Sequence, residues 1–137
     1  MSIEKLPRFN NIYLHHRFIK ELNKELKGFS YRKDFEEWFM SSLRILDDPE
    51  IDSYADSFGG KGDNRFKQID TKLYRIAYHK SEKNIRIIYT VLKGRVIILL
   101  GSFDEKNTQS DYRNHKELAR KRMQDERGAI NAIERNI

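Results

Sequence analysis

The sequence predicts an α+β fold in which N-terminal helices pack on a small antiparallel sheet that is followed by a C-terminal helix. Apolar residues recur at helical spacing before residue 48, and a last helix is expected after residue 110. Three runs dense in β-branched and aromatic residues, joined by short polar links, lie between them over 73–103. We expect the 137 residues to form a single domain over 1–137, with flexible ends at 1–8 and 128–137.

The N-terminal half predicts a short strand and two helices. Residues 9–14 are expected to form the strand, and the first helix follows over 15–27, before Gly28, where a left-handed cap is favourable. Ser30 is a candidate N-cap for the second helix. Apolar and aromatic residues then recur every three or four positions until Asp47-Asp48-Pro49, where proline prevents the helix from continuing.

The C-terminal half predicts a connector, an antiparallel meander and a last helix. Residues 50–63 are acidic, small and rich in glycine, as in a loop. The three apolar runs, 73–80, 85–92 and 95–103, are separated by links of hairpin length, so neighbouring strands should be antiparallel. The last helix is expected over 111–127.

The charge and composition narrow the classes of partner and site. There are 27 Lys and Arg against 21 Asp and Glu, a net charge of +6, and a basic surface of this kind favours a polyanionic partner. The absence of cysteine excludes disulfides, thiolate zinc sites and cysteine nucleophiles. His15 and His16 are adjacent in the predicted first helix, about 100° apart, with no third ligand nearby in the sequence, so no metal site is assigned.

No membrane or export signal is evident in the sequence. The longest apolar run, 96–100, is far shorter than the ~20 residues of a membrane-spanning helix. The N-terminal residues do not show the apolar core and cleavage site of a secretion signal. We therefore expect a cytoplasmic protein that makes no membrane contact.

Two arginines on the predicted strands point to an anion-binding site. Arg75 shares one strand face with His79, and Arg86 is the one cation within the apolar run 85–89. An unpaired guanidinium is costly to bury, so Arg86 should face solvent, a carboxylate or an anionic ligand. If both arginines lie on one face, they form a phosphate clamp with Lys72 and His79 nearby.

Two simpler interpretations stay open. The strand arginines can be solvated at the surface or paired with Glu82 or Asp104. The last helix is basic, and its cations can contact either ribosomal RNA or a partner protein.

The strand motifs resemble a known family over 66–126. The sequence is similar there to toxins of the RelE/ParE superfamily, especially the HigB branch, in segments 73–76, 85–89, 96–103, 104–107 and the helix from Tyr112 to Met123. The resemblance implies a RelE-like fold and a type II toxin–antitoxin toxin that acts as a ribosome-dependent messenger-RNA endonuclease. It also implies a cognate antitoxin protein, with messenger RNA and ribosomal RNA as the nucleic-acid partners.

The resemblance assigns roles to individual residues. Arg75 matches a substrate-contacting position and Arg86 matches the arginine that stabilises the transition-state phosphate, while Tyr112 lies near a stacking or proton-transferring tyrosine. Attack of a ribose 2′-hydroxyl on the adjacent phosphate needs a base and an acid but no metal, and the candidates are His79 first, then Tyr112, with His115 and Glu105. The expected RNA-binding residues are Lys72, Lys106, Arg113, Lys116 and Arg120.

Other functions remain open at this stage. ParE-like members of the same superfamily bind DNA gyrase and are not nucleases, which gives a protein-binding inhibitor as the alternative. A phage or mobile-element factor that inhibits the host through some other target is a third interpretation.

Overall fold

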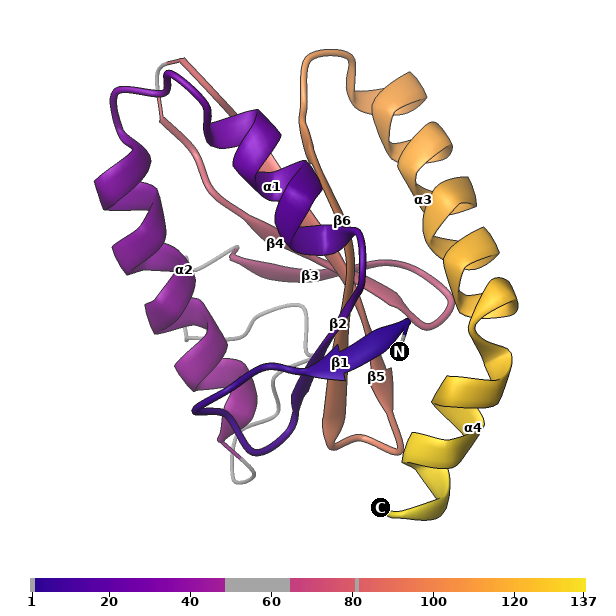
Figure 1. Cartoon of the computed structure of the whole chain (residues 1–137). Helices are drawn as coiled ribbons and strands as arrows, with labels where there is room; N and C mark the ends of the chain where they lie inside the picture. Colours follow the sequence, from indigo (N-terminus) through magenta and orange to yellow (C-terminus); the bar gives the residue numbers. More distant parts are fainter. Residues whose placement is uncertain (1, 49–64, 81) are drawn as a thin grey trace.

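The computed structural model describes residues 2–48, 65–80 and 82–137 (Figure 1). Within these residues, six strands form one sheet in the order β1-β2-β6-β5-β4-β3, and four helices flank it. The strands are β1 (Ile3–Lys5), β2 (Ile12–His15), β3 (Phe66–Asp70), β4 (Leu73–Ala77), β5 (Ile85–Leu92) and β6 (Val96–Asp104). The helices are α1 (Phe18–Leu26), α2 (Arg32–Asp47), α3 (Thr108–Asp125) and α4 (Arg127–Arg135). The predicted α+β class is confirmed.

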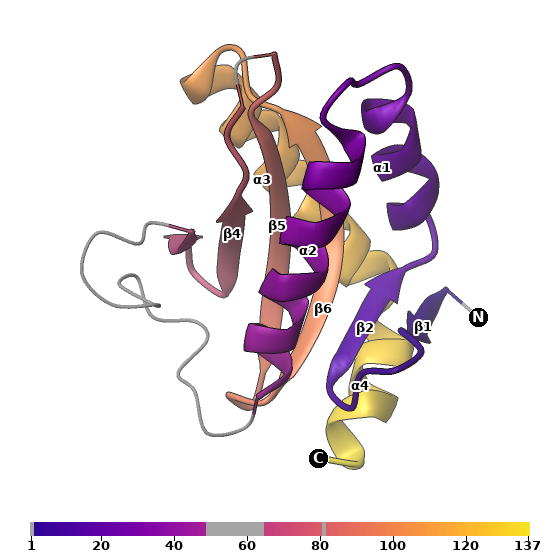
Figure 2. The ribbon, with the colours of Figure 1, turned by 90° about the vertical axis from the view of Figure 1, so that its left-hand side faces the viewer.

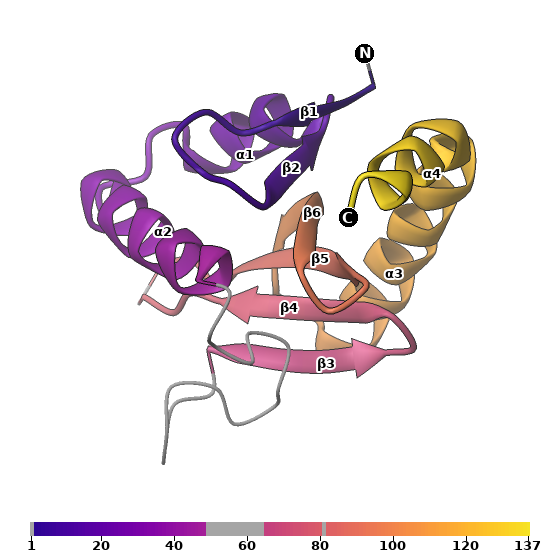
Figure 3. The same ribbon diagram turned by 90° about the horizontal axis from the view of Figure 1, so that it is seen from below.

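The sheet separates two apolar layers. Figure 2 shows α2 in front of the sheet with α3 and α4 behind it, and Figure 3 shows α1 on the same side as α2. Phe18 and Phe35 pack against Ile87 on one face, whereas Ile130 packs in a second cluster with Ile88 on the other. Because both faces are covered, β5 and β6 are almost continuously apolar instead of alternating.

The predicted meander is confirmed, and three further strand pairings extend it to six strands. β4 pairs antiparallel with β5, and β5 with β6, although β4 ends at Ala77 and not at residue 80. β3, which the sequence analysis missed, pairs antiparallel with β4. A register shift between Gln68 and Asp70 interrupts its alternation, which explains the weak sequence pattern. β2 pairs with β6 in parallel, so the sheet is mixed.

The N-terminal elements differ in detail from the prediction. His15 is the last residue of β2, so the first helix begins later than expected. Gly28 has a φ of 72°, as expected for the left-handed residue after a helix. Ser30 does not cap α2, because its hydroxyl donates to Glu82 Oε1 at 3.1 Å. The predicted loop over 50–63 lies outside the described residues.

Parts of both predicted flexible ends form regular structure. Ile3 lies in β1, which pairs antiparallel with β2, and its side chain is buried. Ile130 lies in α4 and is also buried. The apolar pattern at each end of the chain is only a few residues long. It indicates a strand or helix only when the surface against which these residues pack is known. In the part of the chain that the structure describes, no helix is long and apolar enough to cross a membrane.

An ion pair joins the two helical layers around the edge of β6. β2 pairs with β6 only as far as Leu99. Beyond this point, the carbonyl of Leu100 in β6 accepts a hydrogen bond from Arg122 Nη1 at 2.7 Å. The same guanidinium donates to both carboxylate oxygens of Glu21 on α1. Arg122 is therefore buried in the fold, although it belongs to the basic last helix whose cations were expected to be available to a partner.

Replacing Arg122 with alanine should lower the free energy of unfolding by about 3 kcal/mol, because Glu21 and the Leu100 carbonyl lose their shared partner. Urea unfolding measures this difference. Lys121→Ala is the matched control: Lys121 forms an exposed ion pair with Asp125 at 3.1 Å on the same helix, and its loss should change stability by less than about 1 kcal/mol. Equal effects of the two variants would contradict the structural role of Arg122.

Candidate functional site

A cavity of about 560 Å³ opens between the strands β3, β4 and β5 and the N-terminal half of α3. The described residues that line it are mostly polar and carry several positive charges. They are Lys67, Gln68, Ile69, Arg75, Arg86, Glu105, Thr108, Gln109, Tyr112, Arg113 and Lys116. A concave basic surface of this kind suits a phosphate-bearing ligand.

The strand register brings the two predicted arginines together. Arg75 on β4 lies opposite Ile88 on β5, and Arg86 lies opposite Ala77. Residues two apart on a strand point to the same face, so Arg86 and Ile88 share the face that α3 covers. Arg75 and Arg86 therefore line the same cavity, as the sequence analysis expected if they shared a face.

The protein itself holds the guanidinium of Arg86 in place. Its Nε lies 2.7 Å from Glu105 Oε1, and its Nη1 donates to the Tyr78 carbonyl at 2.7 Å. The partner is thus neither Glu82 nor Asp104, the two carboxylates considered from the sequence. Asp104 instead accepts a hydrogen bond from the backbone N–H of Asn84 at 2.9 Å.

Arg75 is also fixed by the backbone. Its Nη1 donates to the carbonyl of Arg65 at 3.0 Å. Each guanidinium has five N–H donors, and a phosphate accepts from two of them at once in the most favourable geometry. Both arginines are thus oriented before any ligand binds.

Glu105 is the acid of the described cavity lining, and it is ionised at neutral pH. Its Oε2 accepts from the Thr108 hydroxyl at 2.7 Å, while Oε1 faces Arg86. Burial raises the pKa of this carboxyl. The hydrogen bonds from Thr108 and Arg86 and the charge of Arg86 together lower it by more, so the pKa lies below its ordinary value. Glu105 is thus an ionised carboxylate in direct contact with Arg86.

Tyr112 keeps its proton at neutral pH. Its ring meets Phe103 edge to face, with centroids 5.2 Å apart. Burial raises the pKa of its hydroxyl and Glu105 adds to this, whereas Arg75 and Arg86 oppose it; the pKa lies above its ordinary value. From the sequence, a catalytic tyrosine was expected to need neighbouring cations that lower its proton affinity. The structure gives the opposite direction, so the Tyr112 hydroxyl is protonated at neutral pH and its proton is held more tightly than in a free tyrosine.

The two candidate histidines lie outside the cavity lining. His79 follows β4 and is exposed. His115 stacks on Phe103, with ring centroids 4.3 Å apart, and burial lowers its pKa. Neither is therefore placed beside the arginines, and the order of candidates drawn from the sequence, with His79 first, does not match the geometry.

The predicted RNA-binding residues divide into two groups. Arg113 and Lys116 line the cavity, whereas Lys72, Lys106 and Arg120 lie outside it. Arg120 forms an ion pair with Asp70 at 3.2 Å, and Lys116 reaches the same carboxylate at 3.5 Å. These pairs hold α3 against the β3–β4 turn.

The sequence analysis missed Lys67, Gln68, Thr108 and Gln109 as lining residues. Lys67 lies opposite Arg75 on the undetected strand β3, and therefore adds a third cation to the row formed by the arginines. Recognition of β3 would have revealed it, since strand alternation places it on the edge of the same surface. Thr108 would have followed from the earlier start of the last helix.

Comparison with known proteins identifies one family. The model of the family described as phage derived protein Gp49-like (DUF891) matches residues 53–124, just over half of the chain. This stretch contains both arginines, Glu105 and Tyr112. No curated protein and no solved structure matches the chain.

Glu105→Gln should lower stability at neutral pH, and the difference from the unchanged protein should shrink as the pH falls. A carboxyl whose pKa is lower in the folded protein contributes stability above its unfolded pKa of about 4.5, and this contribution disappears as the pH falls through the folded value. Urea unfolding at neutral pH and at stepwise lower pH values measures both proteins. A constant difference at every pH would contradict the assigned role of the Glu105 charge.

Proposed function

Because the chain belongs to the phage-derived Gp49-like family, a HigB/RelE-like family of toxins of toxin–antitoxin systems, we propose that it is a toxin that cleaves messenger RNA on the ribosome. A cognate antitoxin protein would keep it inactive. The observation that carries the proposal is the convergence of Arg75, Arg86, Glu105 and Tyr112 on one cavity.

The proposed reaction is attack of a ribose 2′-hydroxyl on the adjacent phosphate, without a metal. Glu105 accepts the hydroxyl proton, and Tyr112 donates a proton to the departing 5′-oxygen. Arg75 and Arg86 bind the non-bridging oxygens and stabilise the negative charge that grows in the transition state. The products are a 2′,3′-cyclic phosphate on one fragment and a 5′-hydroxyl on the other.

The contact between Arg86 and Glu105 gives this reaction a defined first step. In the free protein, the Glu105 carboxylate pairs with Arg86 Nε, which is one of the donors that a phosphate would use. A bound phosphate competes for Arg86, and Glu105 is then free to accept the hydroxyl proton. Loss of one arginine contact also raises the proton affinity of Glu105 towards its ordinary value, which makes it a better base.

The remaining cations of the lining suit the rest of the RNA. Lys67, Arg113 and Lys116 surround the reacting centre and would contact the phosphates of flanking nucleotides. Contacts of this kind are independent of sequence and weaken as the salt concentration rises.

Substitution in the cavity should reduce messenger-RNA cleavage by purified protein in a translating ribosome extract, measured by mapping 5′ ends. Arg86→Ala should slow cleavage about 10²–10³-fold, because it removes a group that stabilises transition-state charge. Tyr112→Phe should slow it about 10²–10⁴-fold, because it removes the general acid.

Arg95→Ala is the charge-matched control, since this residue lies in the β5–β6 turn at the other end of β5. It should cleave at the unchanged rate. If the cavity variants still arrest growth and inhibit gyrase supercoiling, the gyrase-binding alternative is correct and the nuclease proposal is wrong.

The chemistry predicts a strict requirement for one hydroxyl. A messenger RNA with a single 2′-deoxyribose at the cleaved nucleotide should remain intact at that position, because the attacking oxygen is missing. The same substitution one nucleotide upstream should leave cleavage unchanged. Cleavage at the deoxyribose, or a 3′-hydroxyl product, would exclude the 2′-hydroxyl mechanism.

A further inference from the structure

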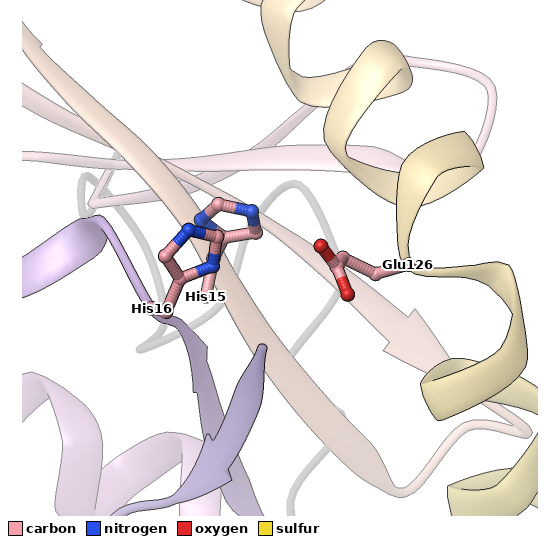
Figure 4. Close-up of side chains that lie close together, drawn as sticks. All are labelled: His15, His16 and Glu126. Atoms are coloured by element: carbon pink, nitrogen blue, oxygen red, sulfur yellow. The ribbon is translucent and has the colours of Figure 1, made fainter. Parts of the chain in front are cut away.

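We propose that His15, His16 and Glu126 bind a divalent transition metal ion of the zinc type, at a site separate from the arginine cavity. Figure 4 shows the two imidazoles close together with the carboxylate facing them across a gap. One ligand atom of each residue lies within 4.8 Å of the other two. The cavity at this cluster shares no lining residue with the cavity that contains Arg75 and Arg86. The inference therefore does not depend on the proposed nuclease function.

The fold brings the two imidazoles together and adds a third ligand, neither of which was evident from the sequence. The sequence analysis rejected the histidine pair because the two side chains would diverge on a helix and no third ligand was near. In the structure, His15 ends β2 and His16 follows it before α1 begins, and their ring centroids lie 4.2 Å apart. Glu126 lies at the joint between α3 and α4 and supplies the third ligand. Both reasons for rejecting a metal site are thus removed.

Both imidazoles are positioned by the fold. His15 is buried at the end of β2, so its ring is confined beside His16 and Glu126. Nδ1 of His16 lies 3.2 Å from the Ser2 carbonyl. A carbonyl only accepts, so Nδ1 is the donor in this contact and Nε2 is the nitrogen that would coordinate a metal. A backbone carbonyl holding the second ring nitrogen is the usual support of a ligating histidine.

Metal binding at His15 requires one rearrangement. In the structure, Nδ1 of His15 accepts a hydrogen bond from the Arg17 N–H at 3.2 Å. A metal on Nε2 moves the ring proton to Nδ1, and this long hydrogen bond is lost. The Arg17 N–H is at the entrance of α1, where the first N–H groups of a helix are free to bond to water.

Two of the three Lys and Arg residues that line this cavity, Lys121 and Arg122, are paired with carboxylates. Both carboxylate oxygens of Glu21 bind Arg122, and Asp125 binds Lys121 at 3.1 Å. The Glu126 carboxylate makes no hydrogen bond or ion pair within the described part of the chain, so its charge is available to a metal ion.

The dimensions suit a metal with nitrogen and oxygen ligands. Neighbouring ligand atoms around tetrahedral zinc lie ~3.4 Å apart for bonds of ~2.0–2.1 Å. The ligand atoms lie within 4.8 Å of one another, so their separations have to shorten by up to about 1.4 Å, for which the side chain of the half-buried Glu126 has rotamer freedom. The adjoining cavity of about 310 Å³ leaves room for a water molecule as the fourth ligand. A bound ion would tie the α3–α4 joint to the end of β2.

Titration of the full-length, metal-free protein with zinc chloride at neutral pH tests the proposal. Isothermal titration calorimetry should detect one saturable site, and zinc should raise the thermal unfolding midpoint. His16→Gln and Glu126→Gln each remove one ligand outside the buried core. Each should weaken zinc binding at least about tenfold and abolish the rise in the midpoint.

His79→Gln is the matched control, because His79 is an exposed histidine after β4 that is not part of the cluster. This variant should bind zinc as tightly as the unchanged protein. The proposal is wrong if the unchanged protein shows no saturable binding. It is equally wrong if His16→Gln and Glu126→Gln bind zinc as tightly as His79→Gln. Each protein's circular dichroism spectrum confirms that it is folded before titration.

Discussion

The register between β4 and β5 positions the whole candidate site. It sets Arg75 opposite Ile88 and Ala77 opposite Arg86, so that two guanidinium groups project from neighbouring strands onto the face covered by α3. A shift by one residue would turn one of them into the apolar layer beneath α1 and α2. The buried residues of β5, above all Ile87 and Tyr89, fix this register, because they fill that layer only in the observed alignment. The core therefore determines the site geometry.

The positive charge of the cavity is partly balanced before any ligand arrives. Glu105 comes from the turn between β6 and α3 and meets Arg86 directly, and Thr108 in the first turn of α3 holds its second oxygen. The start of α3 thus orients Glu105, and the next turn of the helix places Tyr112 close to Glu105 and the two arginines. One short segment thus carries both groups that we propose to transfer protons, while the sheet carries both arginines that we propose to stabilise charge.

Sequence patterns predicted the elements whose apolar runs are long, and failed where the pattern is short. β5 and the meander were found because eight or nine consecutive residues carry the signal. Three elements were missed, namely β1, β3 and α4, because the apolar pattern of each is interrupted by exposed residues within a few positions. Alternation along the strands was sufficient to predict that Arg75 and Arg86 can converge. The proton affinity of Tyr112 depends on residues that meet only in the fold, and the sequence could not give its direction.

The same limit explains why the sequence did not reveal the cluster of His15, His16 and Glu126. His15 and His16 are neighbours in the chain, but Glu126 reaches them only because α3 runs back along the sheet and ends beside β2 (Figure 1). No spacing rule connects these positions. The assignment of His15 to a helix also hid the fact that its ring lies in the core.

The parallel pairing of β2 with β6 has a consequence for how the chain acquires its fold during synthesis. Ile12 of β2 lies opposite Ile97 of β6. β2 can therefore pair with β6 only after most of the polypeptide has been made. The antiparallel strands β3 to β6 are joined by short links, so the entropy cost of closing these links is low and they can associate first. A nascent chain on the ribosome must hold β2, α1 and α2 without their sheet until β6 has emerged. The cavity between β3, β4, β5 and α3 is therefore completed only when translation is nearly finished.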